Sequence, residues 1–346
     1  MRIRSGILRL MFPVLAACMV PQAAYCNSIA LTSEGIADGF TLSTFATTNP
    51  GQIGCCSGPF GIAVTNNGNV LVGTGSGHSY VFADTDGQTT GSALFTNSSN
   101  SGTAAYATVG GNPYGAQSGR FVEFNNDGTV NHTLTGVSTS PYLGMWGNQS
   151  NGHIISTSSA GLIDIDPLAN GGLGSFRVIK AGLYPDGVTV SPDGLTVYVE
   201  NGGTIQGYSI ATGALLSTFN SFGTLSSPDG SGVISSTNSL DGDIIVNFNG
   251  NGSTTGGIGL IDPSTSLFTV IATGGTRGDY VSPDTNNGTL FLDYSDTVER
   301  LSCGPNCSIG GPPPPPSSVP EPGTLAFMGT GLSLLGGAVR RMRKTT

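Results

Sequence analysis

Four cysteines are the residues whose chemistry depends most on where the chain resides. Cys55 and Cys56 are adjacent, and Cys303 and Cys307 flank three residues. In an oxidising compartment disulfides are the default, and four thiols allow three pairings. Because one pair lies early and the other late in the central region, the positions predict at least one bond between the two pairs. Bonds within each pair are the alternative, and a four-thiolate metal site is disfavoured because exported thiolates would have to escape oxidation.

Acidic doublets and histidines are the other residues that could bind a metal or act as catalysts. None of the doublets belongs to a complete twelve-residue calcium loop, so we expect turns in which a short carboxylate accepts a backbone hydrogen bond. The histidines are widely spaced, fit no paired ligand motif, and are expected on the surface or in turns. The sequence therefore predicts no catalytic residue, no metal site and no cofactor. The doublets are Asp84 and Asp86, Asp164 and Asp166, and Asp241 and Asp243; the histidines are His78, His132 and His153.

Charge is distributed unevenly along the chain. The 346 residues carry a net charge of -9, but seven of the twelve basic residues lie in the first nine and last seven positions. Between residues 27 and 311, five basic residues face twenty acidic ones. Electrostatic binding to phosphates requires clustered Lys and Arg, so a nucleic-acid partner is excluded for this body.

A recurring pattern of short strands and tight turns organises the central region. It is clearest over residues 184–210, where Ser191-Pro192-Asp193-Gly194 separates two apolar strands. Pro sets φ early in such a turn and Gly supplies a positive φ later, which closes a hairpin. Similar units begin near Pro59, Pro141, Pro228 and Pro283, and from residue 141 onward they lie 43 to 55 residues apart.

This spacing is typical of four-stranded propeller blades. It predicts an all-β propeller of six blades, with seven as an alternative count, and a β-sandwich or β-solenoid as the alternative fold. Over roughly residues 40–301 the pattern resembles propellers of the YVTN, NHL and gluconolactonase-like kinds. The last resemblance implies a calcium-dependent hydrolase with carboxylate and amide ligands at the axis, but no such set is identifiable in the sequence.

The N-terminus carries an export signal. Residues 1–9 form a positively charged segment, residues 10–20 an apolar run, and residues 21–26 a segment with small residues. This order predicts a secretory signal peptide over 1–26. Leu15-Ala16-Ala17-Cys18 also matches a lipobox, so lipidation of Cys18 is the alternative to ordinary cleavage.

The C-terminus combines three features in a fixed order after a proline-rich linker at 310–318. Pro320, Glu321 and Pro322 come first, an uncharged apolar stretch follows over 323–339, and a basic end closes the chain. Seventeen residues span about 26 Å as a helix, which is at the short end of the range for a membrane crossing, so a single transmembrane helix is predicted over 323–339. Its basic end is expected on the cytoplasmic side. The basic end, predicted to stop the segment at the membrane, contains Arg340, Arg341, Arg343 and Lys344.

This trio resembles the PEP-CTERM sorting signal of Gram-negative bacteria, placed here at 319–346 behind a propeller domain at 27–309. The resemblance implies recognition of Pro320, Glu321 and Pro322 by an exosortase and a destination in the envelope, outer surface or matrix. The function predicted is that of an exported, non-catalytic binding module, with exopolysaccharide as the expected ligand. A calcium-dependent, gluconolactonase-like hydrolase is the alternative.

Overall fold

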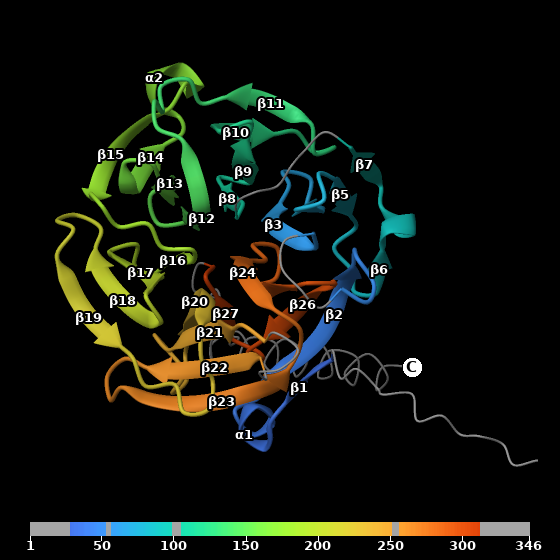
Figure 1. The fold of residues 1–346 in the computed structure, drawn as a ribbon, viewed down its shortest axis with the longest axis vertical. Coiled ribbons are helices and arrows are strands. Elements are labelled where there is room, and N and C mark those ends of the chain that lie inside the picture. The colour runs from blue at the N-terminus through green and yellow to red at the C-terminus, as the bar shows by residue number, and fades with distance from the viewer. Residues whose placement is uncertain (1–27, 53–56, 99–104, 251–255, 312–346) are drawn as a thin grey trace, which may run out of the picture.

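Six β-sheets surround a central axis (Figure 1), which confirms the predicted all-β propeller and sets the number of blades at six. The computed structural model describes residues 28–52, 57–98, 105–250 and 256–311. Two short helices, α1 (Ser33–Ala37) and α2 (Ala169–Gly172), and the 3-10 turn η1 (Thr90–Ser92) lie among the strands of this part.

Blades 1 to 4 are four-stranded antiparallel sheets built from consecutive segments. Blade 1 contains β3 (Pro59–Val64), β4 (Val70–Thr74), β5 (Ser79–Phe82) and β7 (Phe95–Asn97). Blade 2 contains β8 (Ala107–Val109), β9 (Asn112–Gln117), β10 (Arg120–Phe124) and β11 (Val130–Thr133). Blade 3 contains β12 (Pro141–Asn148), β13 (His153–Ser158), β14 (Gly161–Asp166) and β15 (Ser175–Lys180). Blade 4 contains β16 (Val188–Val190), β17 (Thr196–Asn201), β18 (Thr204–Ser209) and β19 (Leu215–Phe219).

Blades 5 and 6 recruit strands from elsewhere in the chain. Blade 5 contains β20 (Pro228–Ser236), β21 (Ile244–Phe248), β22 (Gly257–Asp262) and β23 (Leu267–Gly274), with β1 (Ile29–Leu31) on its outer edge and β27 (Cys307–Ile309) on β20. Blade 6 contains β24 (Gly278–Pro283), β25 (Leu290–Tyr294) and β26 (Thr297–Ser302), followed by β2 (Thr41–Thr47) and β6 (Gln88–Thr89).

The predicted hairpin turn between β16 and β17 forms as its residues require. The Gly194 amide donates to the Ser191 carbonyl over 2.8 Å, and Gly194 has a φ of +74°. Asp193 accepts a hydrogen bond from the Leu195 amide at 3.0 Å. The turn chemistry read from the sequence therefore fixes this hairpin.

Strand pairing closes the ring at the seam between its last and first blades. β2, from the N-terminal part of the body, pairs antiparallel with β26, with Thr41 opposite Ser302 and Thr47 opposite Thr297. β6 then pairs with β2 in parallel, which links blade 1 to blade 6. Figure 1 shows the blue β2 beside β26. The edge that an open ring would leave unpaired is thus covered by backbone hydrogen bonds.

The predicted cysteine clasp across this seam is wrong. Cys303 bonds to Cys307, with their Cα atoms 5.7 Å apart, so neither sulfur is available to Cys55 or Cys56. The physical reason is that β2 already closes the ring, whereas the turn after β26 brings the two later cysteines together. Cys55 and Cys56 themselves lie outside the described residues.

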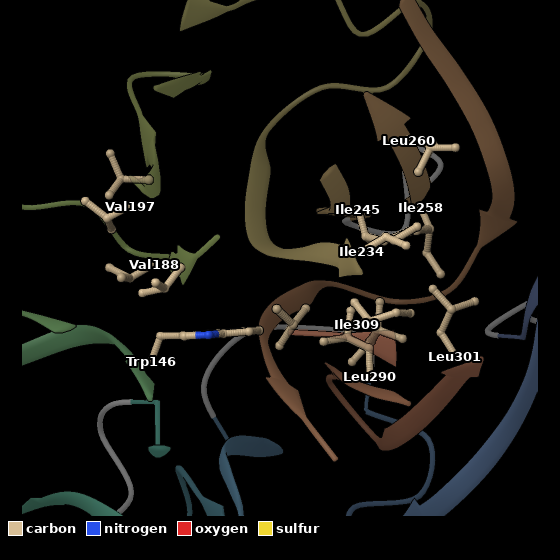
Figure 2. Packing of buried hydrophobic residues seen from close by; sticks show 14 of the residues in the cluster. Trp146, Val188, Val197, Ile234, Ile245, Ile258, Leu260, Leu290, Leu301 and Ile309 are labelled. Atoms are coloured by element: carbon tan, nitrogen blue, oxygen red, sulfur yellow. The ribbon is translucent and has the colours of Figure 1, made fainter. Parts of the chain in front are cut away.

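A buried apolar cluster connects blades 3, 4, 5 and 6. Trp146 of β12 is 1% exposed and belongs to a cluster with Leu290 and Ile309. Figure 2 shows its indole extending from β12 toward these two residues. A Cβ at Gly310 would overlap the indole, so the chain after β27 packs directly on the ring.

The terminal signals fall outside the described residues. This applies to the signal peptide at 1–26, to the linker beyond Gly311 and to the sorting signal with its apolar stretch at 323–339. Within the described ranges, no helix has the length and apolar character needed to span a membrane.

Candidate functional site

The innermost strands of the blades begin at one end of the axis, which we call the mouth. Near this end, two blades carry an apolar residue directly before a glycine, Phe60 and Leu143, and three others carry an acidic residue. The acidic residues are Asp186, Asp229 and Asp279 of blades 4, 5 and 6.

Glycines allow these openings to lie side by side. A Cβ at Gly144 would meet the Asp186 carbonyl, one at Gly187 would meet the Asp229 carbonyl, and one at Gly230 would meet the Asp279 carbonyl. Each inner strand therefore approaches the next at the residue that carries the carboxyl group. Three carboxyl groups follow one another around one side of the mouth.

A pocket of about 280 Å³ lies between blades 4, 5 and 6. We call it the carboxyl pocket; its polar lining residues are Asp186, Glu200, Ser227, Asp229, Asn249 and Arg277. Nδ2 of Asn249 donates to Oδ2 of Asp229 at 2.6 Å, and Nε of Arg277 donates to Oδ1 of Asp279 at 2.7 Å. These bonds hold two of the three mouth carboxylates in place.

Burial disfavours ionisation of the carboxyl groups of this site. It raises the pKa of Asp229 to about 8, and the nearby Asp279 carboxyl adds to this effect. Burial also raises the pKa of Asp279, although Arg277 opposes the rise. The pKa values of Glu200 and Asp293 lie well above the usual range for the same first reason. Burial therefore favours the protonated forms of these carboxyl groups.

Several polar atoms near the pocket have no hydrogen-bond partner. Both carboxyl oxygens of Glu200 are unpartnered although the residue is 6% exposed, and Oδ1 of Asn249 is also unpartnered. Because unsatisfied buried polar groups are costly, such a concentration indicates a place prepared for a ligand or for ordered water.

Two exposed tyrosines stand beside the carboxyl pocket. Tyr142 of blade 3 and Tyr184 of blade 4 are 44% and 53% exposed, with ring centroids 5.6 Å apart and an interplanar angle of 55°. They line a second cavity of about 340 Å³, and Asp186 lines both cavities. We call these residues the tyrosine pair. An aromatic surface and a polar pocket thus share one side chain.

The opposite end of the axis is occupied by the end of the body. β27 pairs with residues 234–236, at the far end of β20 from Asp229. Six residues of strand separate Asp229 from Ser235, about 20 Å at 3.3 Å per residue. With Trp146 packed against Gly310, the chain leaves the body on the side away from the mouth.

In the structure, the histidines and most of the acidic doublets identified in the sequence lie apart from one another. Nδ1 of His153 lies 2.8 Å from Asp164, which also pairs with Arg177 at 2.6 Å. Asp166 accepts hydrogen bonds from the Leu168 and Ala169 amides, as the turn prediction required.

Asp84 and Asp86 do not serve as simple turn residues. Both pair with Arg300 at the seam, where the Arg300 Nε lies 2.9 Å from Asp86. The sorting residues 320–322, the basic residues 340–344, and Cys55 and Cys56 lie outside the described ranges, so their predicted roles stay predictions.

Sequence reasoning missed the carboxyl pocket. Pro-Asp-Gly occurs at both 185–187 and 228–230, and Asp279 follows Gly278 on the next blade. The prolines mark the starts of blades, but a blade start alone does not show where the carboxylates that follow it meet. Superposing the blade openings would have placed Asp186, Asp229 and Asp279 on one rim, but nothing local marks Glu200.

A divalent ion at the axis is what a calcium-dependent hydrolase would require. In the described ranges, no three His, Cys, Asp or Glu side chains converge so that they could hold a metal ion. The guanidinium of Arg277 instead pairs with Asp279 inside the acidic cluster. These residues do not fit a preformed ion site, and we derive no reaction step through one.

Comparison with known proteins supports the two-part organisation of the chain. The family described as the PEP-CTERM protein-sorting motif matches residues 318–344. No curated protein matches the sequence. Among solved structures, a gluconolactonase from Xanthomonas campestris, XC5397, is 16% identical, with a TM-score of 0.54 over 80% of this chain and 95% of that one.

Two further solved structures are more distant. The dihydro-heme d1 dehydrogenase NirN is 12% identical, with a TM-score of 0.43 over 68% of this chain and 52% of that one. A chain of the mitotic checkpoint complex is 16% identical, with a TM-score of 0.46 over 69% of this chain and 74% of that one. This chain thus carries a PEP-CTERM sorting motif behind a six-bladed β-propeller whose fold is similar to that of a gluconolactonase.

Proposed function

We propose that this chain is an exosortase-sorted surface protein whose propeller binds a saccharide at its mouth without transforming it. The sorting motif at 318–344 indicates a secreted protein of the Gram-negative cell envelope. The observation that carries the binding role is the exposed tyrosine pair beside the carboxyl pocket, joined through Asp186.

Each part of the mouth suits a different face of a sugar. Tyr side chains present a large apolar ring with a polar tip and cost little conformational entropy when they are ordered. The C–H face of a sugar ring can pack on such a surface, while carboxylate and amide oxygens accept hydrogen bonds from its hydroxyl groups. The exposed carboxyl group of Asp186, which lines both cavities, supplies such an acceptor.

The position of the tail favours outward presentation of this site. Gly311, the last described residue, follows β27 at the end of the axis opposite the mouth. A tail held at the envelope would then leave the mouth facing the surrounding matrix. Exopolysaccharide is the ligand class that this arrangement would meet first.

A glycan array tests the binding role. The full-length protein, purified in detergent, should bind a subset of saccharides, and Tyr142→Ala combined with Tyr184→Ala should weaken that binding about tenfold. Phe95→Ala is the matched control, because Phe95 is an exposed aromatic residue on the outer strand β7. Binding that is absent, or equal in all three proteins, would refute the proposal.

Removal of the tail tests the sorting role. Deleting residues 319–346 should change the processing or the envelope retention of the protein in its native host. Unchanged retention and processing would remove the case for exosortase sorting.

A gluconolactonase-like hydrolase is the second candidate, favoured by the similar fold of the Xanthomonas protein. Fold similarity alone does not establish catalysis. The test is lactone hydrolysis by metal-stripped protein before and after calcium is restored. Hydrolysis that requires calcium and is abolished by Asp229→Asn would favour the enzyme over the binding module.

A further inference from the structure

The carboxyl pocket is rich in acidic groups and poor in positive charge. Asp186, Glu200 and Asp229 line it, and Arg277 is the one Lys or Arg among its lining residues in the described ranges. That guanidinium is already held by Asp279 through its Nε. The pocket therefore contains more acidic groups than basic ones.

Glu200 provides an independent sign of a missing partner. Its side chain lines the pocket, yet the residue is 6% exposed and neither carboxyl oxygen has a hydrogen-bond partner of good geometry, although the Ser231 hydroxyl lies close enough to lower its pKa. A Cβ at Gly187 would overlap Oε2 of Glu200, so the glycine leaves the carboxyl group room at the pocket wall. A buried carboxyl group without a donor is costly unless a ligand supplies one.

The tyrosine pair limits the class of ligand that could supply the missing hydrogen-bond donor. Asp186 lines both the carboxyl pocket and the cavity beside Tyr142 and Tyr184. Asp186 therefore connects the pocket to a surface of aromatic faces, which attract positive charge. A ligand that fits must combine a flat, partly apolar ring with a compact group carrying several donors and a positive charge.

We propose that the carboxyl pocket binds the protonated amino group of an amino sugar whose ring rests on the tyrosine pair. This inference rests on the proposed saccharide-binding function and names its ligand class. The ammonium group has three donors and no acceptor, which matches a wall of carboxyl oxygens. An N-acetylated sugar replaces that charge with a neutral amide, and an acidic sugar would be repelled.

Binding of an ammonium group should release protons. Burial raises the pKa values of Glu200 and Asp229, the latter to about 8, and so favours the protonated forms of both carboxyl groups. An adjacent positive charge favours their ionised forms. The other titratable groups facing the pocket are Asp186 before β16, Arg277 before β24, and Asp279 and Tyr280 of β24.

Calorimetry with matched oligosaccharides tests the proposal. The full-length protein is titrated with a glucosamine oligomer, with the N-acetylated oligomer of equal length, and with oligolysine of similar charge. The glucosamine oligomer should bind at least about tenfold tighter than either of the others. Repeating the titration in two buffers of different ionisation enthalpy should show proton release to the buffer.

Two variants localise the effect. Glu200→Gln should reduce the preference for the glucosamine oligomer to about twofold or less and reduce the proton release, whereas Glu299→Gln should change neither. Glu299 is the matched control because it is 8% exposed but bonds to Thr44 at the seam. If Glu200→Gln fails to fold, Asp229→Asn is expected to give the same result.

The outcomes separate this inference from the function on which it rests. Equal binding of acetylated and free-amine oligomers would overturn the amine inference and leave saccharide binding intact. Equal binding of oligolysine would reject the amino sugar in favour of charge alone. No binding of any saccharide, here or on the array, would overturn both proposals.

Discussion

At the scale of single residues, the same dipeptide has two roles in this chain. Asp193-Gly194 closes the β16–β17 hairpin, where the Asp193 carboxylate accepts the Leu195 amide. Asp229-Gly230 has the same letters but lies in the inner strand β20, with Asp229 4% exposed. Local turn chemistry predicts the first role, whereas the second depends on the neighbouring blade.

Gly187 is where this tertiary constraint is tightest. A Cβ there would overlap the Asp229 carbonyl and Oε2 of Glu200. Gly187→Ala should therefore lower the free energy of unfolding by about 1 to 3 kcal/mol and weaken ligand binding, because the wall of the carboxyl pocket must move. Urea denaturation of the purified protein measures the first effect.

Gly91 supplies the control for that substitution. Its added Cβ would lie 3.7 Å from Oγ1 of Thr89, an ordinary contact, and its φ is not in the left-handed region. Gly91→Ala should leave stability and binding unchanged. Equal effects of the two substitutions would show that the close packing at Gly187 has no special importance.

At the scale of elements, the seam between blades 6 and 1 shows what sequence reasoning could and could not provide. The spacing of turn residues predicted the blades and nearly fixed their number. It gave no sign that β2 would pair with β26, about 250 residues later, because strand partners across such a distance leave no local pattern. The cysteine clasp was therefore predicted for a seam that backbone pairing already closes.

The disulfide between Cys303 and Cys307 should make a local contribution to stability. The closed loop is short, so the chain-entropy relation gives about 2 kcal/mol, against roughly 5 kcal/mol for a clasp around the whole ring. Replacing both cysteines with Ser should lower the free energy of unfolding by about 2 kcal/mol, as measured by urea denaturation. A loss near 5 kcal/mol, or non-reducing peptide maps that join Cys303 or Cys307 to Cys55 or Cys56, would restore the clasp.

Arg300 is the main polar connection across the seam. Its guanidinium pairs with Asp84, Asp86 and Asp284 and lies 5.1 Å from the Phe45 ring centroid and 4.9 Å from that of Phe291. Asp284 is fully buried, so removing the guanidinium leaves it without its charge partner. Arg300→Met should cost about 3 kcal/mol at neutral pH.

The free energy of unfolding lost through Arg300→Met should be smaller in mildly acidic solution. Burial raises the pKa of Asp284 to about 6 even with Arg300 present, and without it the carboxyl group protonates more readily. Arg120→Met, at an exposed position on β10, is the control and should be neutral. If Arg300→Met changes the free energy of unfolding negligibly, or by an amount independent of pH, the ion pairs of Arg300 contribute little to closure of the ring.

At the scale of the whole molecule, raised carboxyl pKa values should set the pH dependence of stability. Burial raises the pKa of Asp284 to about 6, of Asp243 to about 7 and of Asp229 to about 8. A carboxyl group with a raised folded-state pKa stabilises the fold below its unfolded pKa, near 4, and loses this effect as pH rises through the folded value.

Thermal unfolding at several pH values checks this expectation. The Tm should fall as pH rises from about 5 to about 8, and Asp229→Asn should reduce the fall because the amide has no proton to lose. A Tm that is constant or rises over this interval would contradict the assignment of these groups as buried and largely protonated. Glu34→Gln, at an exposed carboxyl group in α1, should leave the profile unchanged between these pH values.

The central claim is that the mouth binds saccharide while the tail faces the envelope. Its most direct test is the binding of polysaccharide from the host's own matrix to full-length protein immobilised through its C-terminus, so that the mouth faces solution. Wild type should bind, and the Tyr142→Ala, Tyr184→Ala variant should bind about tenfold more weakly at equal loading. Equal binding by the two proteins, or no binding by wild type, would contradict the account.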